Sequence, residues 1–94
     1  MFDLSARAKS ASGVAEVKQL PAGDGIIQVS VDKVTAGTGN VTITVQLGSS
    51  QEYSSIVNGT ISLGAPIGLV IEGKFNAVKA TGAGTDVFEL EVRS

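Results

Sequence analysis

Two carboxylates near the end of the chain have the one spacing in this sequence that suggests acid–base chemistry. Glu89 and Glu91 stand two positions apart in "DVFELEV". In an extended strand, side chains two residues apart share a face and lie about 7 Å from each other. Inverting glycosidases hold an acid and a base at a comparable separation. A solvated outer face, whose charges keep sheets from sticking together, has the same pattern. We expect that second role, because no sugar-stacking Trp accompanies the pair.

Other catalytic and ligand-binding chemistry lacks its usual residues. The chain contains no His and no Cys, so the commonest general base and the commonest metal ligands are missing. Asp24, Asp32 and Asp86 are scattered rather than clustered as a Ca²⁺ loop requires. The glycine pairs do not match a phosphate-binding loop. We therefore predict no catalytic residue, no metal site and no cofactor, and a protein that is not an enzyme.

The balance of charge excludes further classes of partner. The 94 residues include 7 basic and 9 acidic side chains, for a net charge of −2, and no basic run occurs. Nucleic-acid binding therefore lacks its electrostatic footprint. The first ten residues are too polar for a secretory signal, and no apolar run is long enough for a membrane span. We expect a protein that acts where it is made, or in an assembly built there.

Short segments that alternate apolar and polar residues run along most of the chain. In "VTITVQL", the apolar residues Val41, Ile43, Val45 and Leu47 fall on one side. Because successive side chains of a strand point to opposite faces, this pattern predicts a strand with one buried and one solvated face. Turn signals such as "PAGDG" and "TAGTGN" separate the segments, and no helical period is present.

These patterns predict an all-β fold, a single small antiparallel β-sandwich of about seven to eight strands. Residues 1–12 are expected to form an N-terminal arm or an edge strand, and residues 13–94 the β-sandwich domain. The pair Asn58-Gly59 favours a tight turn and is expected to end a short strand.

Residues 34–71 contain a single charged side chain, Glu52. The region is either an exposed Thr- and Ser-rich sheet or a surface that another protein covers, because interface cores are depleted in charge. Tyr53, the only Tyr, is either a half-buried cap on the core or an interface contact. The segment "SLGAPIGLVIEG" is apolar up to Glu72, which suggests that a second surface covers part of it. The candidate interface residues are Phe2, Leu4, Tyr53, Leu63, Pro66, Ile67 and Leu69.

Four segments in this order carry a family resemblance. They are "DLSARAKSASG" (3–13), "IIQVSVDKV" (26–34), "VTITVQLGSSQEY" (41–53) and "FNAVKATGAGTDVFELEV" (75–92). Together they resemble a family of small tailed-phage virion proteins found among head and tail structural components. Tyr53 stands where that family usually places Trp.

The resemblance implies a structural role in the virion rather than catalysis. It suggests a decoration or cement protein that is made in the host bacterial cytoplasm and binds the capsid surface through the apolar patch and the N-terminal arm. Its partner would be the major capsid protein or another virion protein. Because a chain this short buries only roughly 60–65% of its unfolded surface, we also expect a homo-oligomer, with a trimer favoured. The alternative is a tail-fibre or head-fibre domain that binds a receptor or a glycan.

Overall fold

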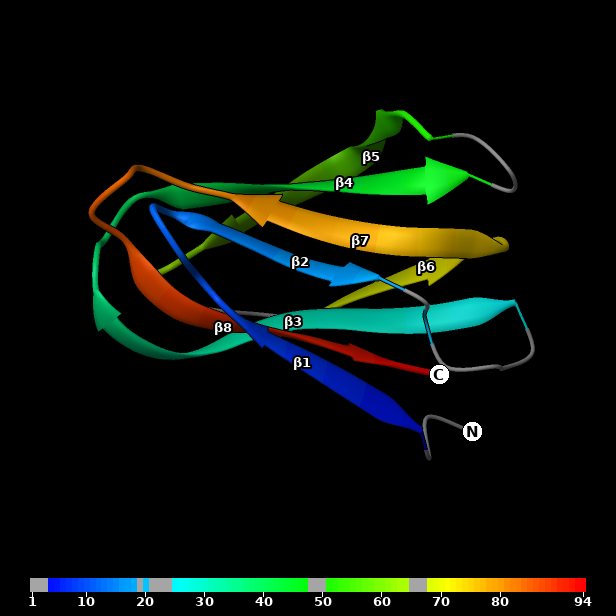
Figure 1. Ribbon diagram of the computed structural model, residues 1–94, viewed down its shortest axis with the longest axis horizontal. Coiled ribbons are helices and arrows are strands. Elements are labelled where there is room, and N and C mark those ends of the chain that lie inside the picture. The colour runs from blue at the N-terminus through cyan, green and yellow to red at the C-terminus, as the bar shows by residue number, and fades with distance from the viewer. Residues whose placement is uncertain (1–3, 19, 21–24, 48–50, 65–67) are drawn as a thin grey trace.

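A computed structural model describes residues 4–18, 20, 25–47, 51–64 and 68–94. The described chain forms two four-stranded antiparallel sheets packed face to face, and this confirms the predicted β-sandwich (Figure 1). No helix in these ranges is long and apolar enough to cross a membrane. The strands are β1 (Ser5–Lys9), β2 (Val14–Lys18), β3 (Ile26–Ala36), β4 (Asn40–Leu47), β5 (Tyr53–Ser62), β6 (Leu69–Glu72), β7 (Phe75–Thr81) and β8 (Val87–Arg93).

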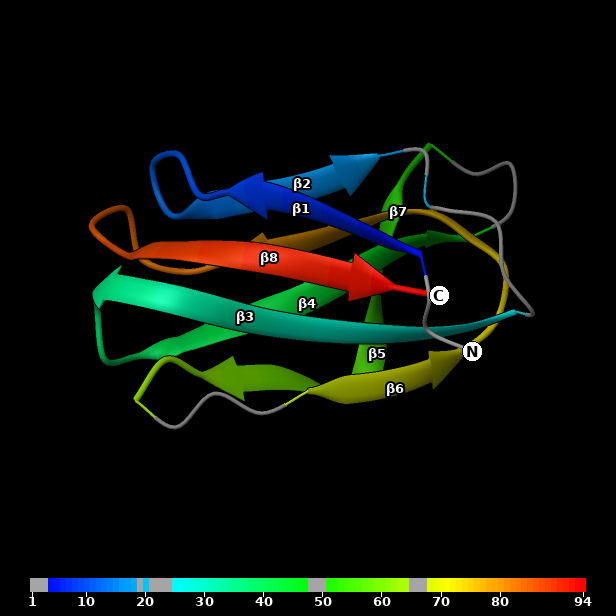
Figure 2. The same ribbon diagram turned by 90° about the horizontal axis from the view of Figure 1, so that it is seen from below.

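The order of the strands defines a jelly roll. One sheet, here sheet A, has the order β1-β8-β3-β6, which Figure 2 shows from its outer side. The other, sheet B, has the order β2-β7-β4-β5. This pairing of eight strands in two sheets is the arrangement of jelly-roll domains. β1 and β2 are the outermost strands along one side of the sandwich, and β5 and β6 are the outermost strands along the other.

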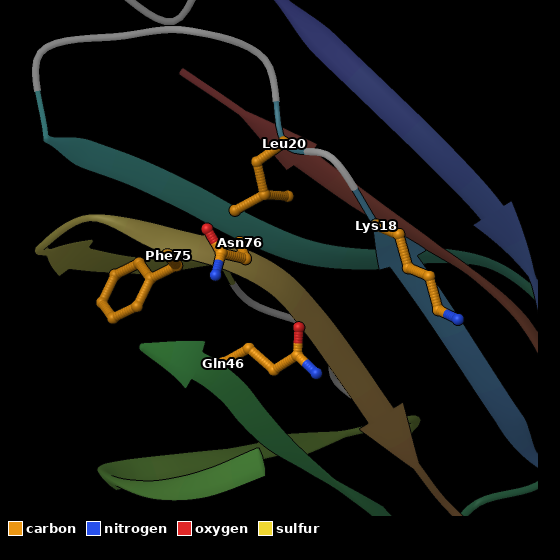
Figure 3. Close-up of a pocket in the computed structure, with 5 residues that line it drawn as sticks. All are labelled: Lys18, Leu20, Gln46, Phe75 and Asn76. Atoms are coloured by element: carbon orange, nitrogen blue, oxygen red, sulfur yellow. The ribbon is translucent and has the colours of Figure 1, made fainter. Parts of the chain in front are cut away.

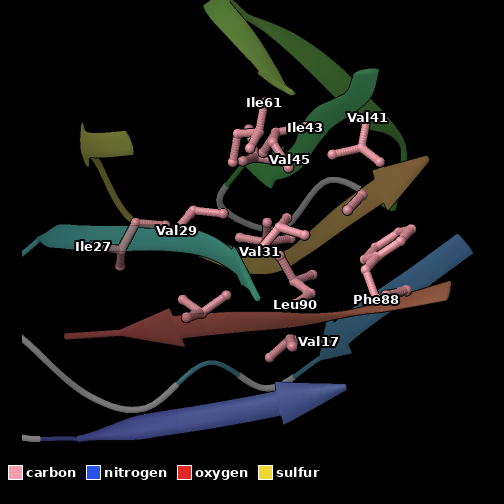
Figure 4. Close-up of a cluster of buried hydrophobic side chains, with 14 of the residues drawn as sticks. Val17, Ile27, Val29, Val31, Val41, Ile43, Val45, Ile61, Phe88 and Leu90 are labelled. Carbon is pink, nitrogen blue, oxygen red and sulfur yellow. The ribbon is translucent and has the colours of Figure 1, made fainter. Parts of the chain in front are cut away.

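The core lies between the sheets and follows the alternation of the sequence (Figure 4). Val41, Ile43 and Val45 of β4 are fully buried, as are Leu90 and Val92 of β8. The alternation of β4 was predicted to include Leu47 among the inward residues, but that side chain is 48% exposed. The pairing of β4 with β7 shifts register between Gln46 and Leu47, which ends the regular alternation there.

The N-terminal residues form an edge strand over Ser5–Lys9. β1 pairs with β8 in antiparallel register, from Ser5 opposite Arg93 to Lys9 opposite Glu89. The pairing extends one residue further, because Leu4 and Ser94 exchange backbone hydrogen bonds of 3.1 and 2.9 Å. Of the two predicted alternatives for this segment, an arm or an edge strand, Ser5–Lys9 forms an edge strand of sheet A.

A tight turn joins β1 to β2 and carries the chain from one sheet to the other. Ala11 and Val14 exchange backbone hydrogen bonds of 2.8 and 3.1 Å. The two residues between them, Ser12 and Gly13, have φ angles of 51° and 78°, as in a type I′ turn. A Cβ atom at position 13 would lie 2.0 Å from the carbonyl oxygen of Ala83, so only glycine fits against the β7–β8 loop.

Candidate protein-interaction site

An apolar groove opens between β5 and β6, the two edge strands on one side of the sandwich. Its volume is about 420 Å³, and it is lined by Ile56, Val57 and Asn58 of β5 and by Leu69, Val70, Ile71 and Glu72 of β6. Val57 is 90% exposed and Val70 is 63% exposed. Isolated apolar side chains are common on protein surfaces, but two of them on facing edges of one groove form a contiguous apolar site.

The groove owes its shape to a bulge in β5. Thr42 of β4 pairs with Thr60, and the next pair is Thr44 with Ser55. Between these two pairs, β4 advances by two residues and β5 by five. Asn58 adopts a positive φ of 57°, which Asn tolerates better than most residues. The extra residues leave the ladder, and Val57 projects from the edge.

Asn58-Gly59 therefore lies inside β5 and does not end a strand, contrary to the prediction from its turn propensity. Gly59 is buried beneath the side chain of Ile56, whose Cγ1 would be 2.6 Å from a Cβ atom at position 59. The lack of a side chain at this position is what lets the bulge fold down onto β4.

The chemistry of the groove suits contact with another protein. Among the described residues that line it, Glu72 alone is charged. β5 and β6 are also the outermost strands of their sheets, and an edge strand presents backbone N–H and C=O groups that an added strand can pair with. The site can take up apolar side chains and an extended segment of a partner.

The predicted interface residues do not lie together on one surface of the structure. Leu69 lines the groove and is half-buried. Leu63 is only 4% exposed and belongs to the core, so it is not available to a partner. Leu4 is 49% exposed, but it adjoins β1, on the opposite side of the sandwich. Phe2, Pro66 and Ile67 lie outside the described residues.

Tyr53 lies across the outer face of sheet B. Its hydroxyl donates a hydrogen bond to Glu16 of β2, and the Nζ atom of Lys79 lies 4.2 Å from its ring centroid. Because Tyr53 belongs to β5 and Glu16 to β2, and β4 and β7 lie between these strands, the two side chains together span β4 and β7. Tyr53 thus makes an internal contact on an outer face and does not cap an end of the core.

Tyr53 and Glu16 shift each other's pKa in opposite directions. The hydrogen bond from Tyr53 lowers the pKa of Glu16 below its ordinary value. Partial burial, together with the bond to Glu16, raises the pKa of Tyr53. Both shifts favour a neutral phenol that donates to an ionised carboxylate over a wide range of pH.

Glu89 and Glu91 both bind one guanidinium on the outer face of sheet A. Arg7 of β1 lies 3.3 Å from Glu89 and 3.2 Å from Glu91. It also donates two hydrogen bonds of 2.8 Å to the carboxylate of Asp32 on β3, which lower the pKa of Asp32. Lys33 adds a contact of 3.5 Å to Glu89. The pair that suggested acid–base chemistry therefore takes part in an ion-pair network that joins β1, β8 and β3.

The remaining acidic residues do not gather into a metal site. Within the described ranges, no group of three or more Asp and Glu side chains is placed to hold a metal ion. Asp86 is buried, and its carboxylate accepts a hydrogen bond of 2.8 Å from the backbone N–H of Ala83. Its role is to close the turn between β7 and β8. Asp24 lies outside the described residues.

A second hollow, of about 380 Å³, lies at one end of sheet B and is a weaker candidate for a binding site than the groove (Figure 3). Leu20, Phe75 and Asn76 line it together with Lys18 and Gln46. Figure 3 shows the amine of Lys18 directed away from the other four side chains. The amide of Gln46 already donates a bond of 3.0 Å to the carbonyl of Gln51. The polar groups of this hollow do not converge on one point.

The sequence interpretation missed Val57 and Val70, the most exposed apolar side chains of the groove. The available signal was "IVNG", two β-branched residues followed by a pair that favours positive φ. That pattern fits a hairpin turn as well as a bulge. The pairing of β5 with β4 determines whether this segment becomes a hairpin turn or a bulge.

Comparison with known proteins gives a likeness of fold. No protein-family model matches the sequence. No curated protein matches it either. A solved structure from Bacillus endospore appendages, described as a novel family of disulfide-linked pili, is similar with a TM-score of 0.52 and 20% sequence identity over 96% of this chain and 81% of that chain. At that identity, the likeness shows a shared fold and nothing further.

Proposed function

We propose that this chain is a non-enzymatic structural subunit that binds the capsid surface of a phage particle in many copies, as a decoration or cement protein. The observation that carries the proposal is the nearly uncharged groove between β5 and β6. The resemblance of four segments to small phage virion proteins supports a phage particle as the binding partner. The jelly roll is compatible with it, since viral capsid proteins use this fold among many others.

Binding would depend on burial of apolar groups and on strand pairing. Val57 and Val70 lose the most exposed surface when the groove is covered, and complete burial of a Val side chain contributes about 1.5–3 kcal/mol. A segment of the major capsid protein, or of another virion protein, that pairs with the β6 edge adds backbone hydrogen bonds. Weak contacts of this kind become effective when many copies bind one lattice.

A second candidate is a subunit of a filament or fibre. The fold that this chain shares with a pilus protein favours it. The pili of that protein are described as disulfide-linked, whereas this chain contains no Cys. A filament of this chain would therefore be held by non-covalent contacts.

A fibre domain that binds a glycan has less support. Sugar sites usually need an exposed aromatic platform. Phe88 is 1% exposed, Phe75 packs partly against the core, and the ring of Tyr53 is engaged with Lys79 and Glu16. The fourth aromatic residue, Phe2, lies outside the described residues.

A charge placed in the groove tests the first candidate. Val57→Glu should reduce co-sedimentation with the particle at least about tenfold, because a carboxylate on an apolar contact must be desolvated without a partner. Leu47→Glu is the matched control, since Leu47 is an exposed apolar residue outside the groove. The particle to use is the one whose major capsid gene is nearest to the gene for this chain.

The outcomes separate the candidates. Loss of binding by Val57→Glu but not by Leu47→Glu supports a capsid contact through the groove. Equal binding by wild type and Val57→Glu contradicts it. Filaments that form in the purified protein alone, seen by electron microscopy, support the second candidate in place of the first.

A further inference from the structure

We propose that β1 is an exchangeable strand, and that in an assembled state the β1 of one copy leaves its own sheet and pairs with β8 of a second copy. The partner is thus another copy of this chain, and the surface is the edge of β8 that β1 covers in the single chain (Figure 2). This inference goes beyond binding to a particle and does not depend on it.

Apolar packing holds β1 only weakly. Its exposed residues alternate with two partly buried ones, Ala6 and Ala8, and each of these offers the core a single methyl group. The neighbouring strand β8 supplies Phe88, Leu90 and Val92, all fully buried. When β1 leaves, the sandwich loses little apolar contact and the core of the other strands remains intact.

The strongest side-chain contacts of β1 belong to Arg7. Its guanidinium binds Asp32 through two hydrogen bonds of 2.8 Å and lies within 3.3 Å of carboxylate oxygens of Glu89 and Glu91. All of these atoms are at the protein surface, where ion pairs exchange readily with water and salt. The contact is therefore specific but not permanent.

The same ion-pair network determines which strand can replace β1 beside β8. If β1 leaves, Asp32, Glu89 and Glu91 lose their shared guanidinium, and Lys33 remains in contact with Glu89. A replacement strand must bring a cation to the position of Arg7 and small residues to the positions of Ala6 and Ala8. The β1 of a second copy has all three in the correct register.

The turn before β2 is suited to act as the hinge. Ser12 has a positive φ of 51°, a conformation that residues other than Gly, Asn and Asp adopt at a cost. Extension of the chain at Ser12 relieves this strain. Gly13 stays fixed, because its carbonyl accepts a hydrogen bond of 2.7 Å from Gly82. Short, strained connections of this kind favour exchange of the preceding element between copies.

A disulfide placed across β1 and β8 distinguishes the two arrangements. Ser5 and Arg93 are opposite each other on exposed positions, and facing residues of antiparallel strands lie within the Cα separation that a disulfide spans. The native chain has no Cys, so the two introduced thiols of Ser5→Cys/Arg93→Cys are the only ones that can form a disulfide, either within one chain or between two. The reduced variant is incubated at high concentration, diluted, oxidised, and analysed by size exclusion and by non-reducing gel.

The proposal predicts that the dimer fraction contains disulfides between chains. Gln28→Cys/Arg93→Cys is the matched control, because Gln28 of β3 faces Arg93 from the other side of β8. β3 does not exchange, so this pair should close within one chain even in the dimer.

Two hinge variants shift the amount of exchange. Ser12→Asn suits the type I′ turn and should lower the inter-chain fraction several-fold. Ser12→Pro cannot adopt a positive φ and should raise it several-fold. Asp32→Asn removes the same contact from the single chain and from the exchanged dimer, so it should speed the exchange and leave the inter-chain fraction at equilibrium unchanged. If Ser12→Pro fails to fold, Ser12→Asn still decides the question.

Two results would overturn the proposal. One is a dimer whose Ser5→Cys/Arg93→Cys disulfides lie within single chains, which would mean that copies associate through another surface. The other is a wild-type chain that stays monomeric at every concentration, together with a Ser12→Pro variant that also stays monomeric if it folds.

Discussion

At the scale of single residues, Tyr53 has a structural role that its sequence context left open. Its hydroxyl donates to Glu16 of β2, and its ring lies beneath the amine of Lys79. The sequence offered a core cap or a partner contact; the structure places Tyr53 on an outer face rather than at an end of the core, and the partner contact stays a prediction. The reason is that the place of Tyr53 depends on which strands lie beside β5, and local sequence does not specify that. By contrast, the alternation of Val41, Ile43 and Val45 was sufficient to predict their burial.

Removal of the Tyr53 hydroxyl should weaken the fold in a pH-dependent way. Tyr53→Phe is expected to lower the free energy of unfolding by about 1 kcal/mol at pH 7, a modest value because the pair is partly solvated. The bond lowers the pKa of Glu16 in the folded state. Its contribution is therefore complete above the ordinary Glu pKa of 4.5 and is lost as the pH falls through the lower, folded value.

Urea unfolding of both proteins at a series of pH values measures this difference. The gap between wild type and Tyr53→Phe should be constant near neutral pH and should narrow below about pH 4.5. Glu16→Gln supplies the control, because in that background Tyr53→Phe should have an effect that does not change with pH. A gap of the same size at every pH would mean that the ionised form of Glu16 does not matter.

At the scale of single elements, β5 is the strand that the sequence described least well. Its bulge between Ser55 and Thr60 interrupts the alternation that identified β3, β4 and β8. The bulge requires Gly59 beneath Ile56 and a positive φ at Asn58. These are tertiary requirements, whereas the same dipeptide in isolation favours a hairpin turn. The groove that depends on the bulge was accordingly not predicted, although Leu69 on its other wall was.

Substitution of Gly59 tests whether the bulge is tightly packed. In Gly59→Ala, the added methyl group would meet Ile56 at 2.6 Å and the carbonyl oxygen of Ile43 at 2.9 Å. The backbone of β4 cannot yield easily, so we expect a loss of about 1–3 kcal/mol in the free energy of unfolding. Chemical denaturation measures it.

Gly39→Ala is the matched control for that experiment. No heavy atom lies within 4 Å of a Cβ atom at Gly39, so this substitution should leave the unfolding free energy nearly unchanged. Equal stability of the two alanine variants would show that the bulge has room to relax and that its shape is not fixed by Gly59.

At the scale of the whole molecule, the sequence predicted the class of fold but not its topology. Alternation and turn signals identify strands and their inward faces, and eight strands in two antiparallel sheets agree with them. They do not identify neighbours, and several strand orders bury the same residues. The order β1-β8-β3-β6 joins the two ends of the chain in one sheet. It also places Ser5–Lys9 in that sheet as an edge strand, where Arg7 forms ion pairs with β3 and β8.

That topology places the two proposed contact surfaces on opposite sides of the molecule. One side, along β5 and β6, carries the groove with Val57 and Val70. The other begins with β1, whose ionic contacts and strained hinge suit it for exchange with a second copy. A subunit with two such sides can contact a large particle and its own neighbours at once.

Amide hydrogen exchange of the protein, free and bound to its particle, shows whether a partner covers the groove. We expect the amides of β6 and of the β5 bulge at Ile56, Val57 and Asn58 to become protected on binding, since a partner covers the groove and pairs with the open edge. Amides of β7, in the interior of sheet B, should not change. Protection confined to other strands, with β6 and the bulge unchanged, would contradict the assignment of the groove as the contact surface.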